Sequence, residues 1–160
     1  MTSEHGPTTG DQRPATNDLQ DLLRHARRIA VVGLSPNPAR PSHEVAEYLQ
    51  SAGYTIIPVR PGVTSVLGEP AVPDLASVLA AGRGPIDIVD VFRRPEAIPA
   101  LTDEILALSN PPRLVWLQVG VVDDASAARL EAAGIPVVMD RCLAVEMRRL
   151  RVEFGELEPE

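Results

Sequence analysis

Five short apolar runs, each rich in β-branched residues, alternate with amphipathic helical patterns along most of this chain. Runs of this length between glycine, proline and polar residues are typical of strands buried on both faces. The five predicted strands span 29–34, 54–59, 86–92, 113–119 and 135–140. Strands alternating with helices favour a parallel sheet, joined by right-handed crossovers and covered on both sides. The predicted fold is therefore α/β: a doubly wound, Rossmann-like three-layer sandwich with a five-stranded parallel sheet.

The helical patterns carry start and stop signals. The clearest begins near Pro41, which suits a first helical turn, and ends at Gly53. A second begins near Pro95, and Asp123 can cap a third. Shorter helices are expected at 73–80, as a lead-in from residue 17, and after Cys142 at the end of the domain. The 160 residues are expected to form a disordered leader (1–16), one folded domain (17–150) and an acidic tail (151–160).

Composition excludes several classes of protein. Fifteen basic and 22 acidic residues give a net charge of −7, which argues against a nucleic-acid partner, because nucleic-acid binding needs a basic face. No apolar run approaches the length of a membrane span, and residues 1–17 lack the apolar centre of a signal peptide. The single cysteine excludes an internal disulfide framework and favours a reducing, cytoplasmic location. An acidic protein can still bind an anion where its arginines gather.

In a doubly wound sheet, ligands bind beyond the carboxyl ends of the strands, where the winding reverses. The first strand ends in "GLSPNPARPS". Gly33 lets the backbone approach a ligand, and the following helix offers free N–H groups and a positive dipole end. Ser35 and Ser42 can donate hydroxyl hydrogen bonds, while Arg40 can bind phosphate oxygens with its planar fork. This turn is predicted to bind phosphate, against the alternative of a tight turn with a solvated arginine.

The next two strand ends add further arginines. An NAD site usually has an acidic residue about 20 positions after the glycine turn, where it binds the ribose. This chain has Arg60 there, which suits a phosphorylated ribose, as in coenzyme A or NADP. The third strand ends in Phe92, Arg93 and Arg94, which could contact a pyrophosphate or stack near an adenine. Each arginine could instead be a solvated surface residue.

The last two strand ends supply polar groups and the only thiol. Gln118 and Gly120 lie at the end of the fourth strand and can approach a ligand closely, although the glycine could serve the turn alone. At the fifth end, Asp140 and Arg141 can pair with each other. Cys142 stands where a helix begins; that helix end and the neighbouring arginine favour the reactive thiolate. Packing as a small apolar residue is the alternative for this thiol.

These segments resemble the small bacterial CoA-binding proteins, stand-alone relatives of the CoA-binding domain of succinyl-CoA synthetase α subunits. The resemblance covers about residues 17–150 and is carried by "VVGLSPNPARPSHEVAEYLQSAGY", "IIPVRPG", "LGEPAVPDL", "DIVDVFRR", "VWLQVGVV" and "MDRCLAVEMRRL". It implies a single Rossmann domain that binds coenzyme A across the switch point. The implied contacts are Gly33, Ser35, Arg40, Ser42, Val59, Arg60, Phe92, Arg93, Gln118 and Gly120. One departure is Arg60, because relatives commonly have asparagine there; an arginine should accommodate a 3′-phosphate well.

The function expected from these features is non-enzymatic binding of coenzyme A or acyl-CoA, as a sensor or carrier. The resemblance does not extend to the phosphohistidine segment of the synthetases, and "GLSPN" does not match the nucleophile-elbow motif. No catalytic residue is therefore assigned. One cysteine and scattered histidines give no metal-ligand spacing. Two alternatives stay open: an NADP-dependent oxidoreductase, which Arg60 would suit, and a non-catalytic subunit that docks on a separate enzyme. If a bound pantetheine arm crosses the sheet, its thiol could contact Cys142.

Overall fold

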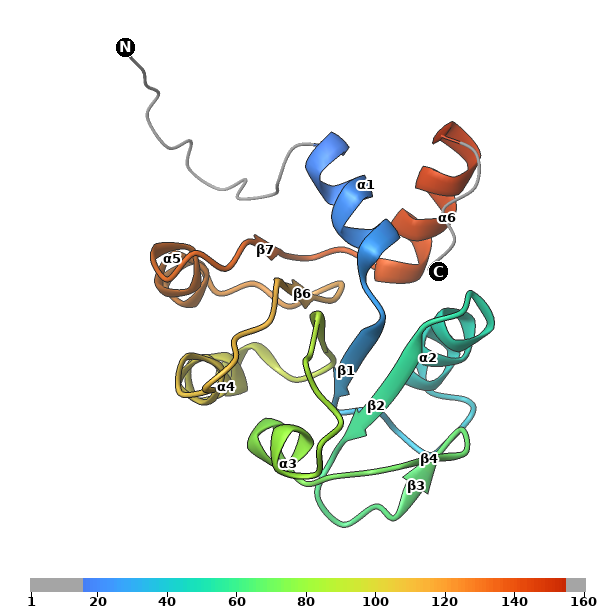
Figure 1. Cartoon of the computed structure of the whole chain (residues 1–160), viewed down its shortest axis with the longest axis vertical. Coiled ribbons are helices and arrows are strands. Elements are labelled where there is room, and N and C mark those ends of the chain that lie inside the picture. Colours follow the sequence, from blue (N-terminus) through green and yellow to red (C-terminus); the bar gives the residue numbers. More distant parts are fainter. Residues whose placement is uncertain (1–15, 155–160) are drawn as a thin grey trace.

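A five-stranded parallel sheet forms the centre of the protein in the computed structural model, which describes residues 16–154 (Figure 1). The strands are β1 (Arg28–Val32), β2 (Thr55–Val59), β5 (Ile88–Val91), β6 (Leu114–Leu117) and β7 (Val137–Val138). Their order in the sheet is β2-β1-β5-β6-β7, and all four neighbouring pairs are parallel. The predicted doubly wound α/β fold is therefore confirmed, with each strand shorter than the apolar run that predicted it.

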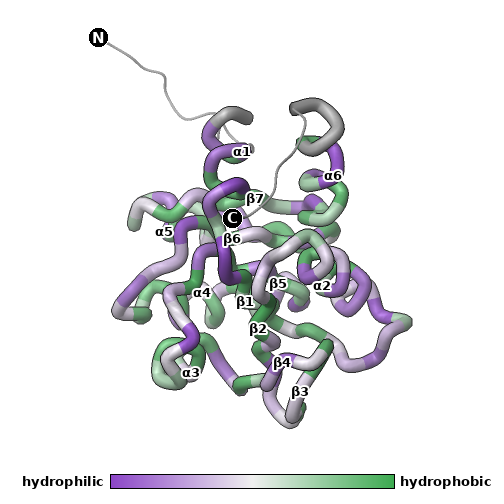
Figure 2. Tube along the Cα trace, turned by 45° about the vertical axis from the view of Figure 1, so that its right-hand side comes forward, coloured by the Kyte–Doolittle hydropathy of each residue, from purple (hydrophilic) through white to green (hydrophobic). Residues whose placement is uncertain are grey.

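Helices cover both faces of this sheet. They are α1 (Thr16–His25), α2 (Pro41–Ser51), α3 (Leu75–Ala80), the 3₁₀ turn η1 (Pro95–Ala97), α4 (Ile98–Leu106), α5 (Asp124–Ala132) and α6 (Leu143–Phe154). In Figure 1, α3, α4 and α5 lie on one side of the sheet, and α1, α2 and α6 lie on the other. Two separate hydrophobic clusters match these layers, because successive strand residues alternate between the faces. Figure 2 accordingly shows the central strands as largely hydrophobic.

The winding of the chain reverses between β1 and β5. From β1 the chain passes through α2 to β2 at the sheet edge, and it then returns past β1 to β5 and continues to β6 and β7. Between β2 and α3 it forms a small antiparallel hairpin of β3 (Ser65–Val66) and β4 (Glu69–Pro70), which the sequence analysis missed. The neighbouring carboxyl ends of β1 and β5 are therefore the switch point where this fold class binds ligands.

The ends of the folded region differ slightly from those expected. Helix α1 begins at Thr16, and α6 continues to Phe154, past the expected start of the tail at residue 151. Residues 1–15 of the expected leader and 155–160 of the expected tail lie outside the described residues. Within 16–154, no helix has the length and apolar character needed to cross a membrane.

Candidate functional site

A cleft of about 600 Å³ opens at the carboxyl ends of β1, β2 and β5, at the switch point of the sheet. Clefts of this size are typical of small-molecule and cofactor sites. Its lining residues are Gly33, Ser35, Arg40, Pro41, Ser42, Val59, Arg60, Pro61, Phe92, Arg93 and Arg94. The structure thus brings together eight of the ten predicted contacts and adds Arg94 and two prolines. Whether these residues touch a ligand stays a prediction.

Gly33 allows the chain after β1 to approach the chain after β5 closely. Its backbone has φ +86°, and a Cβ built there would lie 2.2 Å from the carbonyl oxygen of Phe92. The Gly33 N–H donates to the Val59 carbonyl at 2.9 Å, which ties the turn to the end of β2. A side chain at this position would clash with rigid backbone and adopt a disfavoured conformation, so the cleft floor requires glycine.

The two serines fix the turn that forms one wall of the cleft. The Ser42 hydroxyl accepts a hydrogen bond from the Ser35 N–H, and the Ser35 hydroxyl accepts one from the Asn37 N–H, each at 3.0 Å. Because a hydroxyl has one proton as well as two acceptor lone pairs, both serines can still donate to an anion. Helix α2 begins here at Pro41 without a side-chain cap, so its positive end faces the same space.

Four arginines give the cleft its charge. Arg40, Arg60, Arg93 and Arg94 come from three different strand ends, and the described lining contains no carboxylate. Three of these arginines are exposed, whereas Arg60 is half-buried. Arg93 and Arg94 also line a smaller adjoining hollow of about 450 Å³ with Glu96 and Ala97. In a chain of net charge −7, this gathering of guanidinium groups creates a local site for an anion.

Gln118 and Gly120 do not line this cleft. The Gln118 side chain is 5% exposed, and its Nε2 donates to Oδ1 of Asp90 at 2.5 Å. Gly120 lies on an exposed loop, where its N–H donates to the Asp140 carboxylate at 2.7 Å. Their proposed ligand contacts stay untested, but the geometry commits the amide nitrogen of Gln118 to a partner inside the protein.

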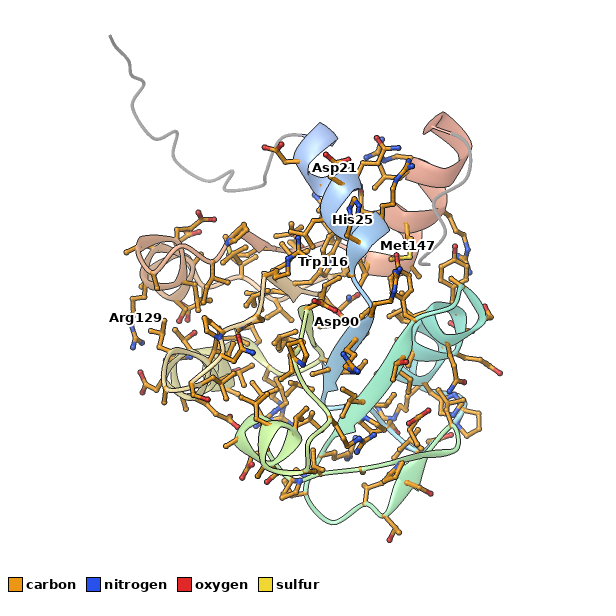
Figure 3. The ribbon with its side chains drawn as sticks, viewed as in Figure 1. Asp21, His25, Asp90, Trp116, Arg129 and Met147 are labelled. Carbon is orange, nitrogen blue, oxygen red and sulfur yellow. The ribbon has the colours of Figure 1, made fainter. Side chains whose placement is uncertain are left out.

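Asp90 is the polar residue that the sequence analysis passed over. It lies within β5, paired in register with Val31 and Trp116, and Figure 3 shows it near the centre of the molecule. The side chain is fully buried, and within the described region its Oδ2 has no hydrogen-bond partner. Burial raises the pKa of this carboxyl to about 7, partly opposed by the Gln118 hydrogen bond. The second aspartate of "DIVDVF", with apolar residues on both sides inside a predicted strand, was the available signal.

The end of the fifth strand differs from the expected pairing. Arg141 does not pair with Asp140; its Nη1 lies 3.7 Å from Oε2 of Glu146, one turn along α6. The Asp140 carboxylate instead accepts a hydrogen bond from the Gly120 N–H in the loop after β6, and its backbone, with a positive φ of 60°, turns the chain just after β7. Cys142 is half-buried, packs against the hydrophobic cluster on the α2 and α6 side, and is not among the cleft residues. Its contact with a ligand thiol stays a prediction.

Fold and cleft together define a doubly wound α/β domain with a cationic cleft at its switch point. The family model of the CoA binding domain matches residues 27–148. The chain therefore belongs to the CoA-binding domain family, as its sequence motifs indicated.

Individual relatives agree with this assignment. Uncharacterized protein YneT of Bacillus subtilis is 42% identical over 134 residues, which cover 84% of this chain and 95% of YneT. A solved structure from Thermus thermophilus, cell-free ID.343, has a TM-score of 0.77 and 43% identity and covers 84% of this chain and 97% of its own. A hypothetical protein from Pyrococcus horikoshii has a TM-score of 0.79 and 27% identity, and the match covers 91% of this chain and 99% of that protein's chain.

Proposed function

We propose that this protein binds coenzyme A or an acyl-CoA in the cleft at the ends of β1, β2 and β5, as a non-enzymatic sensor or carrier. The observation that carries the proposal is the gathering of four arginines, without a lining carboxylate, at the switch point of a CoA-binding domain. Coenzyme A carries a pyrophosphate and a 3′-phosphate, and guanidinium groups bind phosphate oxygens with paired hydrogen bonds. The serine hydroxyls and the α2 N-terminus add neutral donors to the same space.

The non-enzymatic role is supported by the chemistry of the lining residues. Acid–base catalysis commonly uses histidine, carboxylate, lysine, tyrosine or cysteine, and the described cleft lining contains none of these. Ser35 and Ser42 are hydrogen-bonded to backbone N–H groups, whereas a nucleophilic serine needs a neighbouring base. The cleft is therefore suited to holding a nucleotide rather than to reacting with it.

Two measurements test this proposal. Mass spectrometry of gently purified protein should detect retained coenzyme A or acyl-CoA, and titration calorimetry should show coenzyme A binding to ligand-free protein. Arg93→Ala should weaken that binding by about 1.5–3 kcal/mol, the range for a hydrogen bond to a charged group. Its stability should change little, because the Arg93 side chain is exposed.

Arg113→Ala is the matched control. It also removes an exposed arginine, but Arg113 precedes β6 at the amino ends of the strands, opposite the cleft at their carboxyl ends, so coenzyme A binding should be unchanged. Equal affinities of the Arg93 variant and the parent would remove Arg93 from the site. Failure of the parent protein to bind coenzyme A or acyl-CoA would contradict the proposed function itself.

A further inference from the structure

Arg60 differs from the other three cleft arginines in how it is held. Its Nη1 lies 3.3 Å from the carbonyl oxygen of Gly33 and donates to it across the carboxyl ends of β1 and β2. Its backbone N–H donates to the Val72 carbonyl at 2.8 Å. Among the described contacts, none of comparable kind holds the guanidinium of Arg40, Arg93 or Arg94, which are exposed. The position of Arg60 is therefore set before a ligand arrives.

The contact with Gly33 leaves most of the guanidinium available. The group carries several N–H donors in a planar fork, and one of them is committed to the Gly33 carbonyl. The Gly33 turn is also held without this contact, because its own N–H donates to the Val59 carbonyl at 2.9 Å. Support of the Gly33 turn therefore does not by itself account for a half-buried arginine in the cleft wall.

The location of Arg60 indicates which part of a nucleotide it meets. It directly follows β2 and lies 27 residues after Gly33. In doubly wound folds the residue near this strand end binds the ribose: a carboxylate accepts from free ribose hydroxyls, and an arginine accommodates a ribose phosphate. The described cleft lining contains no carboxylate.

We propose that Arg60 makes the cleft select nucleotides whose ribose carries a phosphomonoester, such as the 3′-phosphate of coenzyme A. The inference rests on the proposed function, because it assumes that coenzyme A occupies this cleft. A guanidinium held in place loses little side-chain freedom when it binds, so the phosphomonoester should contribute more here than at a mobile surface arginine. Two oxygens of the phosphomonoester dianion can accept hydrogen bonds from this guanidinium together.

The test compares ligands that differ by this one phosphate. Titration calorimetry with coenzyme A and dephospho-CoA should show the parent protein binding coenzyme A roughly 10- to 100-fold more tightly. Arg60→Gln should abolish this preference by weakening coenzyme A binding while leaving dephospho-CoA binding nearly unchanged. Arg60→Lys keeps the charge without the fork and should retain part of the preference. Arg113→Gln, a matched loss of charge away from the cleft, should keep the full preference.

The outcomes separate this inference from the function it rests on. Equal binding of coenzyme A and dephospho-CoA by the parent protein, or a preference unchanged in Arg60→Gln, overturns the role of Arg60 but leaves coenzyme A binding intact. Tighter binding of NADPH than of coenzyme A, abolished in Arg60→Gln, supports phosphate selection and contradicts the proposed ligand. Binding of none of these nucleotides contradicts both. The comparison in the parent protein needs no variant, so poor folding of Arg60→Gln cannot rescue the proposal.

Discussion

At the scale of single residues, the cleft collects side chains from three separate strand ends, while the side chain of Gln118 at a fourth strand end points into the sheet. Gly33, Arg60 and Phe92 each lie at the carboxyl end of a predicted strand, and parallel strands bring their carboxyl ends to one edge, so proximity followed from chain order alone. Gln118 also follows a strand, yet its amide turns to Asp90 inside the sheet. That direction depends on a neighbour 28 residues away, which no local pattern contains.

Asp90 should make the stability of this protein fall as the pH rises. Its pKa is raised by burial to about 7, above the ordinary value of 3.8, so between these values the folded state holds a proton that the unfolded state releases. The free energy of unfolding should therefore decrease from about pH 4 to about pH 7 and level off above. The loss for this group is on the order of 4 kcal/mol at most.

Asp90→Asn keeps the shape of the side chain and removes the titration. Denaturant unfolding at pH 5 and pH 8 should show a smaller loss of stability in this variant than in the parent protein. Glu47→Gln, which removes an exposed carboxylate from α2, should retain the parent's loss. Parallel pH profiles of the Asp90 variant and the parent would show that the Asp90 carboxyl does not titrate in this range.

At the scale of helices and strands, the periodicity of apolar residues predicted which elements form, whereas backbone hydrogen bonding determined where each one begins and ends. The run 135–140 predicted a strand, but only Val137–Val138 pair with β6, because Asp140 turns the chain with a positive φ. The β3–β4 hairpin was missed because its strands have two residues each. Its turn places Leu67 and Gly68 at positive φ, where Asn-Gly would have been the recognisable signal.

The cap of α5 is an element that the sequence predicted in detail. Asp123 precedes the helix, and its carboxylate accepts from the Ser126 N–H at 2.9 Å, as an N-cap does. Asp123→Ala should lower the free energy of unfolding by about 1 kcal/mol. Coenzyme A affinity should stay the same, because α5 does not line the cleft.

Asp123→Ser provides the control for this prediction, since serine is a comparable cap. Denaturant unfolding should place its stability near that of the parent protein. If alanine and serine destabilise the protein equally, the carboxylate acts through some contact other than the cap. A parallel loss of coenzyme A affinity would mean that α5 and the cleft are coupled.

At the scale of the whole molecule, two opposing charges act on an anionic ligand. The chain carries −7 overall, while the cleft gathers four arginines from the ends of three strands. Composition argues against a nucleic-acid partner but leaves the binding of a small anion open, and the fold places the arginines together. The sequence could predict this gathering because the fold class was readable, but the cleft's volume and the fixed position of Arg60 depend on packing between strands.

The effects of the net charge and of the cleft arginines should be distinguishable in the salt dependence of coenzyme A binding. The screening length is about 30 Å at 0.01 M salt and about 10 Å at 0.1 M, so the repulsion by the whole protein fades first. Attraction inside the cleft acts over shorter distances and persists. Below about 0.1 M, added salt should therefore weaken binding only slightly, because the loss of the repulsion offsets most of the loss of the attraction. Above it, the dissociation constant should rise more steeply, by roughly tenfold towards 1 M.

Calorimetric titrations across this range, with coenzyme A, dephospho-CoA and uncharged pantetheine, provide the measurement. The rise above 0.1 M should be smaller for dephospho-CoA, which lacks one phosphate, and absent for pantetheine. Arg94→Gln should reduce the rise for coenzyme A, because it removes one exposed charge from the cleft, whereas Arg113→Gln should not. Equal slopes for coenzyme A and pantetheine would mean that the arginines of the cleft do not bind phosphate, and that contacts with the pantetheine arm supply the affinity.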